Sequence, residues 1–142
     1  MTGPFHHRDA IAAGVSGWLR LLCGLLLWWE PIGFALIAAG AFNAISVRGT
    51  PVVLVLLART VAAALCVAAG RALLDRKPSG PGLAKVALGL SGTIHVFAYL
   101  TPYFPSNRMP GDTPLYVAAT LAYYGGWLVY LSRSRQVTSI DG

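Results

Sequence analysis

Charged residues are scarce in this chain of 142 residues: they make up 11% of it, and only five are acidic. A soluble domain carries about 25% charged residues, so this chain has too little polar surface to cover a globule in water. The sequence also lacks metal-ligand spacing, the sharp turn of a hydrolase nucleophile and a glycine-rich phosphate loop. We therefore expect no soluble domain and no enzyme.

Cysteine is also rare. Cys23 and Cys66 are the only two, and both fall within apolar stretches. We interpret them as packing residues and not as a disulfide or a metal site. Before residue 17 there is no short apolar run that ends in a small-residue cleavage site. We therefore expect the first apolar stretch to be retained in the mature protein.

Long apolar stretches are what the chain has in abundance. Four of them cover residues 17–39, 51–73, 83–104 and 113–131. Crossing about 30 Å of hydrocarbon takes about 20 helical residues, so each is long enough to span a bilayer. The sequence predicts an all-α polytopic membrane protein, one domain over residues 1–142 that forms a four-transmembrane-helix bundle with short loops. Residues 51–73 are rich in alanine on most faces, which predicts the central packed helix.

The first stretch has two interpretations, because Pro31 interrupts it and the apolar run continues to Ile45. In one, a kinked helix crosses the membrane from Gly17 to Ala39. In the other, the crossing ends near Trp29 and residues 32–45 lie along the membrane interface.

The basic residues predict the orientation. Chain segments that end on one side of a four-span bundle carry eight of the eleven Lys and Arg residues: Arg8, Arg20, Arg71, Arg76, Lys77, Lys85, Arg133 and Arg135. Arg48 and Arg108 fall on the other side, and Arg59 falls within the second stretch. The positive-inside rule then places both termini in the cytoplasm. Basic residues at span ends indicate contact with the lipid bilayer and not with nucleic acid.

Local signals mark where the helices begin and end. Thr50-Pro51 and Thr113-Pro114 each place a candidate N-cap residue before a proline in the first turn. Residues 75–82 read as a polar turn that proline and glycine keep non-helical. Aromatic residues gather on the predicted outer side, as in an aromatic belt: Tyr99, Tyr103, Phe104 and Tyr116.

Polar side chains inside the stretches are the candidate site. At the helical rise per residue, Glu30, Arg59, His95, Tyr123 and Tyr124 all fall about 10–16 Å below the outer boundary of the hydrocarbon. A charge in hydrocarbon costs about 2.5–3.5 kcal/mol at a helix centre. We therefore predict an ion pair between Glu30 and Arg59 inside the bundle, with His95 and a tyrosine as neighbours. Such a layer either fixes the helix register or forms a functional site. In a third interpretation the depths differ from these and Glu30 lies in water.

Three functions remain open. The first is a non-enzymatic accessory or scaffold subunit that packs against a larger membrane complex, respiratory or photosynthetic, or against itself. The second is a small proton- or cation-coupled carrier that uses Glu30, which is similar to the membrane-embedded Glu of small multidrug exporters. The third is a subunit that binds haem, chlorophyll or quinone through His95. Since His6 and His7 precede the spans, a haem held by two histidines is not expected.

The two ends of the membrane region carry a resemblance. Gly17-Trp18-Leu19 is followed by an apolar run to Pro31, and residues 127–138 read Trp-Leu-Val-Tyr-Leu-Ser-Arg-Ser-Arg-Gln-Val-Thr. Both segments resemble a family of small four-span bacterial inner-membrane proteins of unknown function. The resemblance implies a bacterial inner (cytoplasmic) membrane with both termini cytoplasmic. It implies no activity and no catalytic residue.

Overall fold

The computed structural model describes residues 17–102 and 109–141, and every regular element in these ranges is a helix. The predicted all-α class is therefore confirmed for the described residues. Three of its helices are long and apolar enough to cross a membrane: Gly17–Arg48, Thr50–Leu74 and Gly80–Leu100. The fourth predicted span, α6 (Thr113–Arg133), is a helix of 21 residues whose tyrosines, threonines and glycines make it more polar.

The first helix is longer than the sequence indicated. It runs without a break through α2 (Gly17–Gly24), the π-helical turn η1 (Leu25–Trp29) and α3 (Glu30–Arg48). The helix continues past both Trp29 and Ala39, and which of the two expected membrane crossings it makes stays a prediction. It stops at Gly49, whose φ of 68° is a backbone conformation that glycine adopts at no steric cost.

The remaining helices are α4 (Thr50–Leu74), α5 (Gly80–Leu100) and α6, followed by a short α7 (Arg135–Asp141). The turn between α4 and α5 is shorter than expected, because α5 begins at Gly80 and not after Gly82. Gly49 and Asp112 occupy the N-cap positions of α4 and α6, and neither makes a side-chain capping bond. The predicted threonine caps are therefore wrong, since Thr50 and Thr113 already lie in the first turn.

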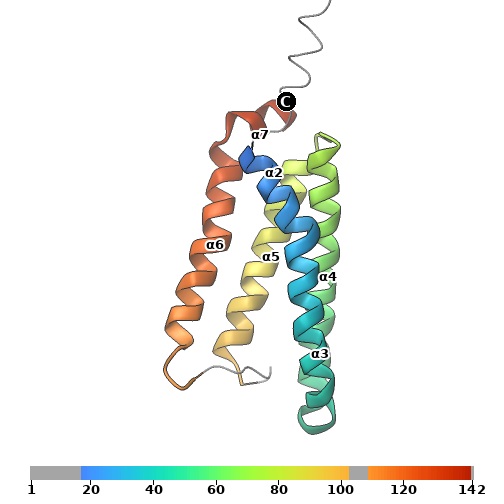
Figure 1. Cartoon of the computed structure of the whole chain (residues 1–142), viewed down its shortest axis with the longest axis vertical. Coiled ribbons are helices and arrows are strands. Elements are labelled where there is room, and N and C mark those ends of the chain that lie inside the picture. Colours follow the sequence, from blue (N-terminus) through green and yellow to red (C-terminus); the bar gives the residue numbers. More distant parts are fainter. Residues whose placement is uncertain (1–16, 103–108, 142) are drawn as a thin grey trace, which may run out of the picture.

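The long helices pack in chain order (Figure 1). The first helix lies against α4 along its whole length, α4 packs on α5, and α5 packs on α6. The prediction that residues 51–73 form the central helix is thus confirmed. Within the described ranges, no extensive backbone packing joins α3 to α6.

Basic residues gather at one end of the bundle. The start of α2, the α4–α5 turn and α7 lie together there, and the α3–α4 turn lies at the opposite end (Figure 1). The segments at the first end, called the basic end below, carry Arg20, Arg71, Arg76, Lys77, Lys85, Arg133 and Arg135. At the opposite end Arg48 donates a hydrogen bond of 2.6 Å to the carbonyl of Pro102. Arg8, Arg108, Tyr103 and Phe104, used in the orientation and belt arguments, lie outside the described residues.

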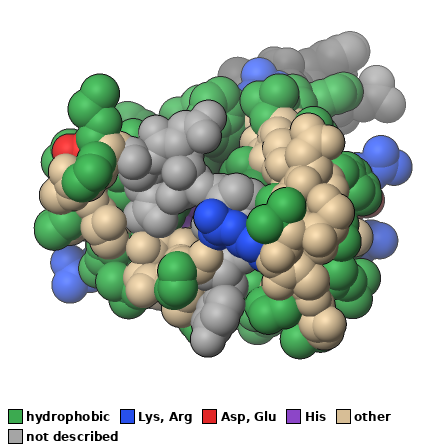
Figure 2. Space-filling view, turned by 90° about the horizontal axis from the view of Figure 1, so that it is seen from below, with side chains coloured by type: hydrophobic (Ala, Val, Ile, Leu, Met, Phe, Trp, Pro, Cys, Tyr) green, Lys and Arg blue, Asp and Glu red, His purple; other side chains and the backbone are tan. Residues whose placement is uncertain are grey.

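Two apolar clusters form the core. The larger one, at the basic end, unites Leu19 and Leu22 of α2 with residues of α4, α5 and α6, and Val137 of α7 belongs to it. Helix α7 was not predicted from the sequence, because its seven residues are mostly polar. The smaller cluster lies toward the opposite end and draws its residues from α3, α4 and α5. Seen from that end, hydrophobic side chains lie around much of the outer edge of the bundle (Figure 2).

Candidate functional site

A cavity of about 270 Å³ lies within the bundle, and all four long helices contribute to its wall. Its lining includes Tyr124 from the larger apolar cluster and Ile37, which packs against the smaller one. The five residues of the predicted polar layer all line it: Glu30, Arg59, His95, Tyr123 and Tyr124. Whether they act as a functional site stays a prediction.

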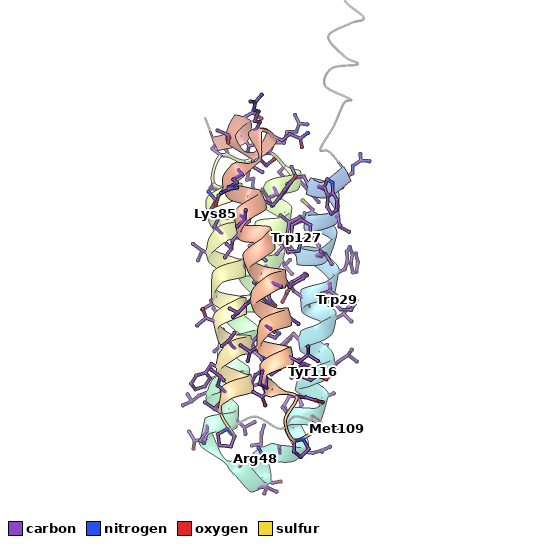
Figure 3. The ribbon with its side chains drawn as sticks, turned by 90° about the vertical axis from the view of Figure 1, so that its left-hand side faces the viewer. Trp29, Arg48, Lys85, Met109, Tyr116 and Trp127 are labelled. Carbon is purple, nitrogen blue, oxygen red and sulfur yellow. The ribbon has the colours of Figure 1, made fainter. Side chains whose placement is uncertain are left out.

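The cavity reaches the surface of the bundle. Trp29 on the first helix is 63% exposed and Tyr116 on α6 is 42% exposed, yet both side chains line the cavity. Figure 3 shows Trp29 near the middle of the bundle and Tyr116 nearer the end opposite to Lys85. Since α3 and α6 are not packed extensively together, we place the opening of the cavity between these two helices.

The π turn that precedes Glu30 positions its side chain at the site. Pro31 has no N–H to give to the carbonyl four residues back, and its ring clashes with that carbonyl in a regular α-helix. The chain responds by widening over Leu25–Trp29, where the N–H of Glu30 donates to the carbonyl of Leu25, five residues back. Such bulges occur often at functional sites. Here the bulge sets the face of the helix on which Glu30 emerges.

Tyr124 is the partner of Glu30. Its hydroxyl donates a hydrogen bond of 2.8 Å to Oε1 of Glu30, which links α6 to the first helix. The Tyr124 ring is 7% exposed and lies against Gly92 of α5, where an added Cβ would come within 3.1 Å of it. The close approach of α5 and α6 at Gly92 therefore positions the hydroxyl. Tyr123 meets the same ring edge to face, with centroids 4.9 Å apart.

His95 continues the hydrogen-bond chain. Its Nδ1 lies 2.8 Å from the carbonyl of Ser91 and 3.3 Å from the hydroxyl oxygen of Tyr124. A carbonyl oxygen only accepts, so Nδ1 is the donor. The chain of donors thus runs from His95 through Tyr124 to Glu30. Among the described residues, Nε2 of His95 has no hydrogen-bond partner.

Arg59 lies in the same wall and is only 6% exposed. Glu30, which carries the opposite charge when ionised, lines the same cavity. A buried guanidinium needs such a partner, because its desolvation costs several kcal/mol. A direct ion pair between the two side chains stays a prediction.

The sequence analysis did not place six polar or aromatic residues in the cavity wall: Trp29, Phe34, Ser91, Tyr99, Tyr116 and Thr120. The four-residue spacing of most of them along the chain could have predicted their place in the wall. Ser91, His95 and Tyr99 follow one another at intervals of four residues, and so do Tyr116, Thr120 and Tyr124. Residues four apart share a helix face, so each series forms one polar stripe. His95 and Tyr99 are in ring contact, as are Tyr99 and Tyr116.

Metal chemistry finds no support in the described ranges, which hold no group of three or more His, Cys, Asp or Glu side chains able to bind an ion. Cys23 and Cys66 are buried free thiols, and the sulfur of Cys66 lies 3.5 Å from the hydroxyl of Ser91. The cavity is near the lower limit of about 300 Å³ for ligand pockets. That volume suits a ring-sized group, and binding of haem, chlorophyll or quinone through His95 stays a prediction.

The chain matches no protein-family model, no curated protein and no solved structure. The resemblance to small four-span inner-membrane proteins therefore rests on residues 17–31 and 127–138, together with the number and order of the apolar stretches and the basic segment between the second and the third.

Proposed function

We propose that this chain crosses a bacterial inner membrane four times, with the basic end in the cytoplasm. Three helices meet the requirements of length and hydropathy. At about 1.5 Å per residue, the 21 residues of α6 cover about 30 Å, the thickness of the hydrocarbon. Since α6 lies beside α5, a fourth crossing brings α7 back to the basic end. The positive-inside rule supports the cytoplasmic side, and the family resemblance supports the bacterial inner membrane.

We further propose that the bundle binds the polar head of a lipophilic molecule in its cavity. The observation that carries this proposal is the polar wall itself: an acid, a guanidinium, an imidazole and several phenols surround one open space within otherwise apolar helices. Polar side chains inside a membrane are costly and mark ligand or ion pathways. The opening between α3 and α6 would admit a ligand from the lipid while its tail stays in the bilayer.

The polar cavity favours ligand binding over the accessory-subunit and carrier hypotheses. An accessory subunit needs apolar outer faces, which this bundle shares with any membrane protein, and a polar cavity adds nothing to that role. A carrier that uses Glu30 would need the carboxylate to exchange partners, and here Tyr124 holds it. Quinone is the one cofactor of the third hypothesis whose ring suits the volume. No reaction is assigned to the site.

Filling the cavity tests this function. Ala119 lines the cavity and its neighbour Ala118 does not, while both side chains are exposed. We expect Ala119→Trp to block the cavity and Ala118→Trp to leave it open. The protein and both variants are purified from the membrane in mild detergent, and their organic extracts are compared by mass spectrometry.

The expected result is a lipophilic compound that accompanies the unaltered protein and Ala118→Trp in equal amounts and is lost from Ala119→Trp. If all three extracts contain the same compounds, the cavity is not a binding site. Recovery of stoichiometric partner proteins, with no compound that depends on Ala119, would favour the accessory subunit instead.

A further inference from the structure

The hydrogen bonds around His95 decide what kind of head group the cavity accepts, provided that the cavity is the ligand site proposed above. A neutral imidazole has one N–H donor and one bare acceptor nitrogen, and the bond made by one nitrogen fixes the role of the other. Nδ1 lies 2.8 Å from the Ser91 carbonyl and must carry the proton. Nε2 is then the acceptor.

Tyr124 and Glu30 reinforce this tautomer. The Tyr124 hydroxyl gives its proton to Oε1 of Glu30 at 2.8 Å. Its oxygen is thereby left to accept from Nδ1 of His95, 3.3 Å away. Both neighbours of Nδ1 therefore act as acceptors. Because Tyr124 is buried against α5, this orientation is built into the packing of α6.

The rest of the wall favours an aromatic ring. His95 is in ring contact with Tyr99 and Tyr124, and Tyr99 is in turn in contact with Tyr116. Offset and edge-to-face contacts between aromatic rings are stabilising. A cavity of about 270 Å³, near the lower limit of about 300 Å³ for ligand pockets, suits one substituted six-membered ring.

We propose that the ligand is a lipid-soluble phenol or quinol, an aromatic ring whose hydroxyl donates a hydrogen bond to Nε2 of His95. The ring lies among the tyrosines and the tail extends through the opening between α3 and α6. An ether or ester of the same ring lacks the donor and leaves Nε2 bare. His95 thus acts as the residue that determines specificity.

The tautomer is tested first, by nitrogen NMR of the protein labelled with ¹⁵N-histidine. His95 is the only histidine among the described residues, since His6 and His7 precede residue 17. The chemical shifts of the two ring nitrogens distinguish a protonated Nδ1 from a protonated Nε2. We expect the proton on Nδ1, and a proton on Nε2 would overturn the proposal.

Ligand binding is tested with matched probes, a long-chain alkylphenol and its O-methyl ether, in detergent. Trp29 lines the cavity, so tryptophan fluorescence reports binding. We expect the phenol to bind about tenfold more tightly than the ether, the effect of one hydrogen bond of about 1.4 kcal/mol. His95→Phe should abolish this preference. Thr93→Val should keep it, since Thr93 lies exposed on the same helix and bonds only to Gly89.

The outcomes separate the two proposals. If both probes bind with equal affinity and Ala119→Trp blocks both, the cavity is a ligand site and the phenol proposal fails. If neither probe binds, the phenol proposal fails, and the extract comparison decides whether the cavity binds another class of ligand. Because the comparison of phenol with ether uses the unaltered protein, a His95 variant that does not fold leaves the test intact.

Discussion

At the scale of single residues, the site combines side chains that sequence can find with contacts that it cannot. Counting helical rise from the ends of the apolar stretches is enough to put Glu30, Arg59 and His95 at one height, because the rise of an α-helix is fixed. The rotation of each helix about its axis is not fixed in this way. The hydrogen bond from Tyr124 to Glu30 depends on that rotation and on Gly92, so sequence reasoning named a tyrosine neighbour without its contact.

A prediction at this scale concerns Glu30 and Arg59. Arg59→Ala leaves the acid in the bundle without its opposite charge, which costs about 3–5 kcal/mol for a buried pair. We expect the cost of Arg59→Ala to be smaller when Glu30 is already Gln, by a coupling free energy of about 0.5–3 kcal/mol. The measurement is a double-mutant cycle of unfolding free energies in detergent. Additive effects of the two substitutions would show that the side chains do not form a pair.

At the scale of the helices, the start and composition of each apolar stretch could be predicted, and one interpretation carried a kinked helix through Pro31. The π turn and the full length of the first helix were not predicted. The rule that proline ends a helix holds in water, where freed backbone groups bond to solvent. In lipid the backbone must stay hydrogen-bonded within the chain. The helix therefore passes Pro31 by widening into η1 and continues to Arg48. The short α7 was missed for a different reason, because its one fully buried residue, Val137, lies in a polar segment.

A prediction at the scale of the element follows from η1. Alanine is a better helix former than proline by about 3 kcal/mol, so an isolated helix would gain from Pro31→Ala. In the bundle we expect a loss of about 1–3 kcal/mol, because closing the π turn rotates Glu30 by about 100° relative to α2 and breaks its bond to Tyr124. Unfolding of the purified variant in detergent measures the change.

Pro51→Ala is the matched control. Pro51 lies in the first turn of α4, where the N–H that proline lacks would have no helical partner in any case. We expect this substitution to be nearly neutral. A Pro31→Ala variant that is as stable as the unaltered protein, or more so, would contradict the positioning role of the π turn.

At the scale of the whole molecule, charge and packing agree on one arrangement. The basic segments lie together at one end of the bundle, as the alternation of the apolar stretches along the chain predicted. The packing of the helices in chain order, with no extensive packing between α3 and α6, was not predictable. It depends on side-chain shapes along whole helix faces, and periodicity does not specify these.

Labelling tests the arrangement in the membrane. Lys77 lies in the α4–α5 turn at the basic end, and Met109 is 75% exposed beyond the opposite end of α5. In intact cells we expect a membrane-impermeant maleimide to label Met109→Cys and to leave Lys77→Cys unlabelled until the cells are lysed. The unaltered protein is the control, since Cys23 and Cys66 are buried. Labelling of both variants in intact cells would refute the proposed topology.

The unequal sizes of the two apolar clusters have a consequence for ligand exchange. The larger cluster joins α2 to α6 at the basic end, whereas the smaller one omits α6. In the proposed orientation, the described helices are joined toward the inner leaflet by a cluster that includes α6, whereas the cluster toward the outer leaflet does not include it. We therefore expect a hydrophobic compound to exchange with the cavity by way of the outer leaflet.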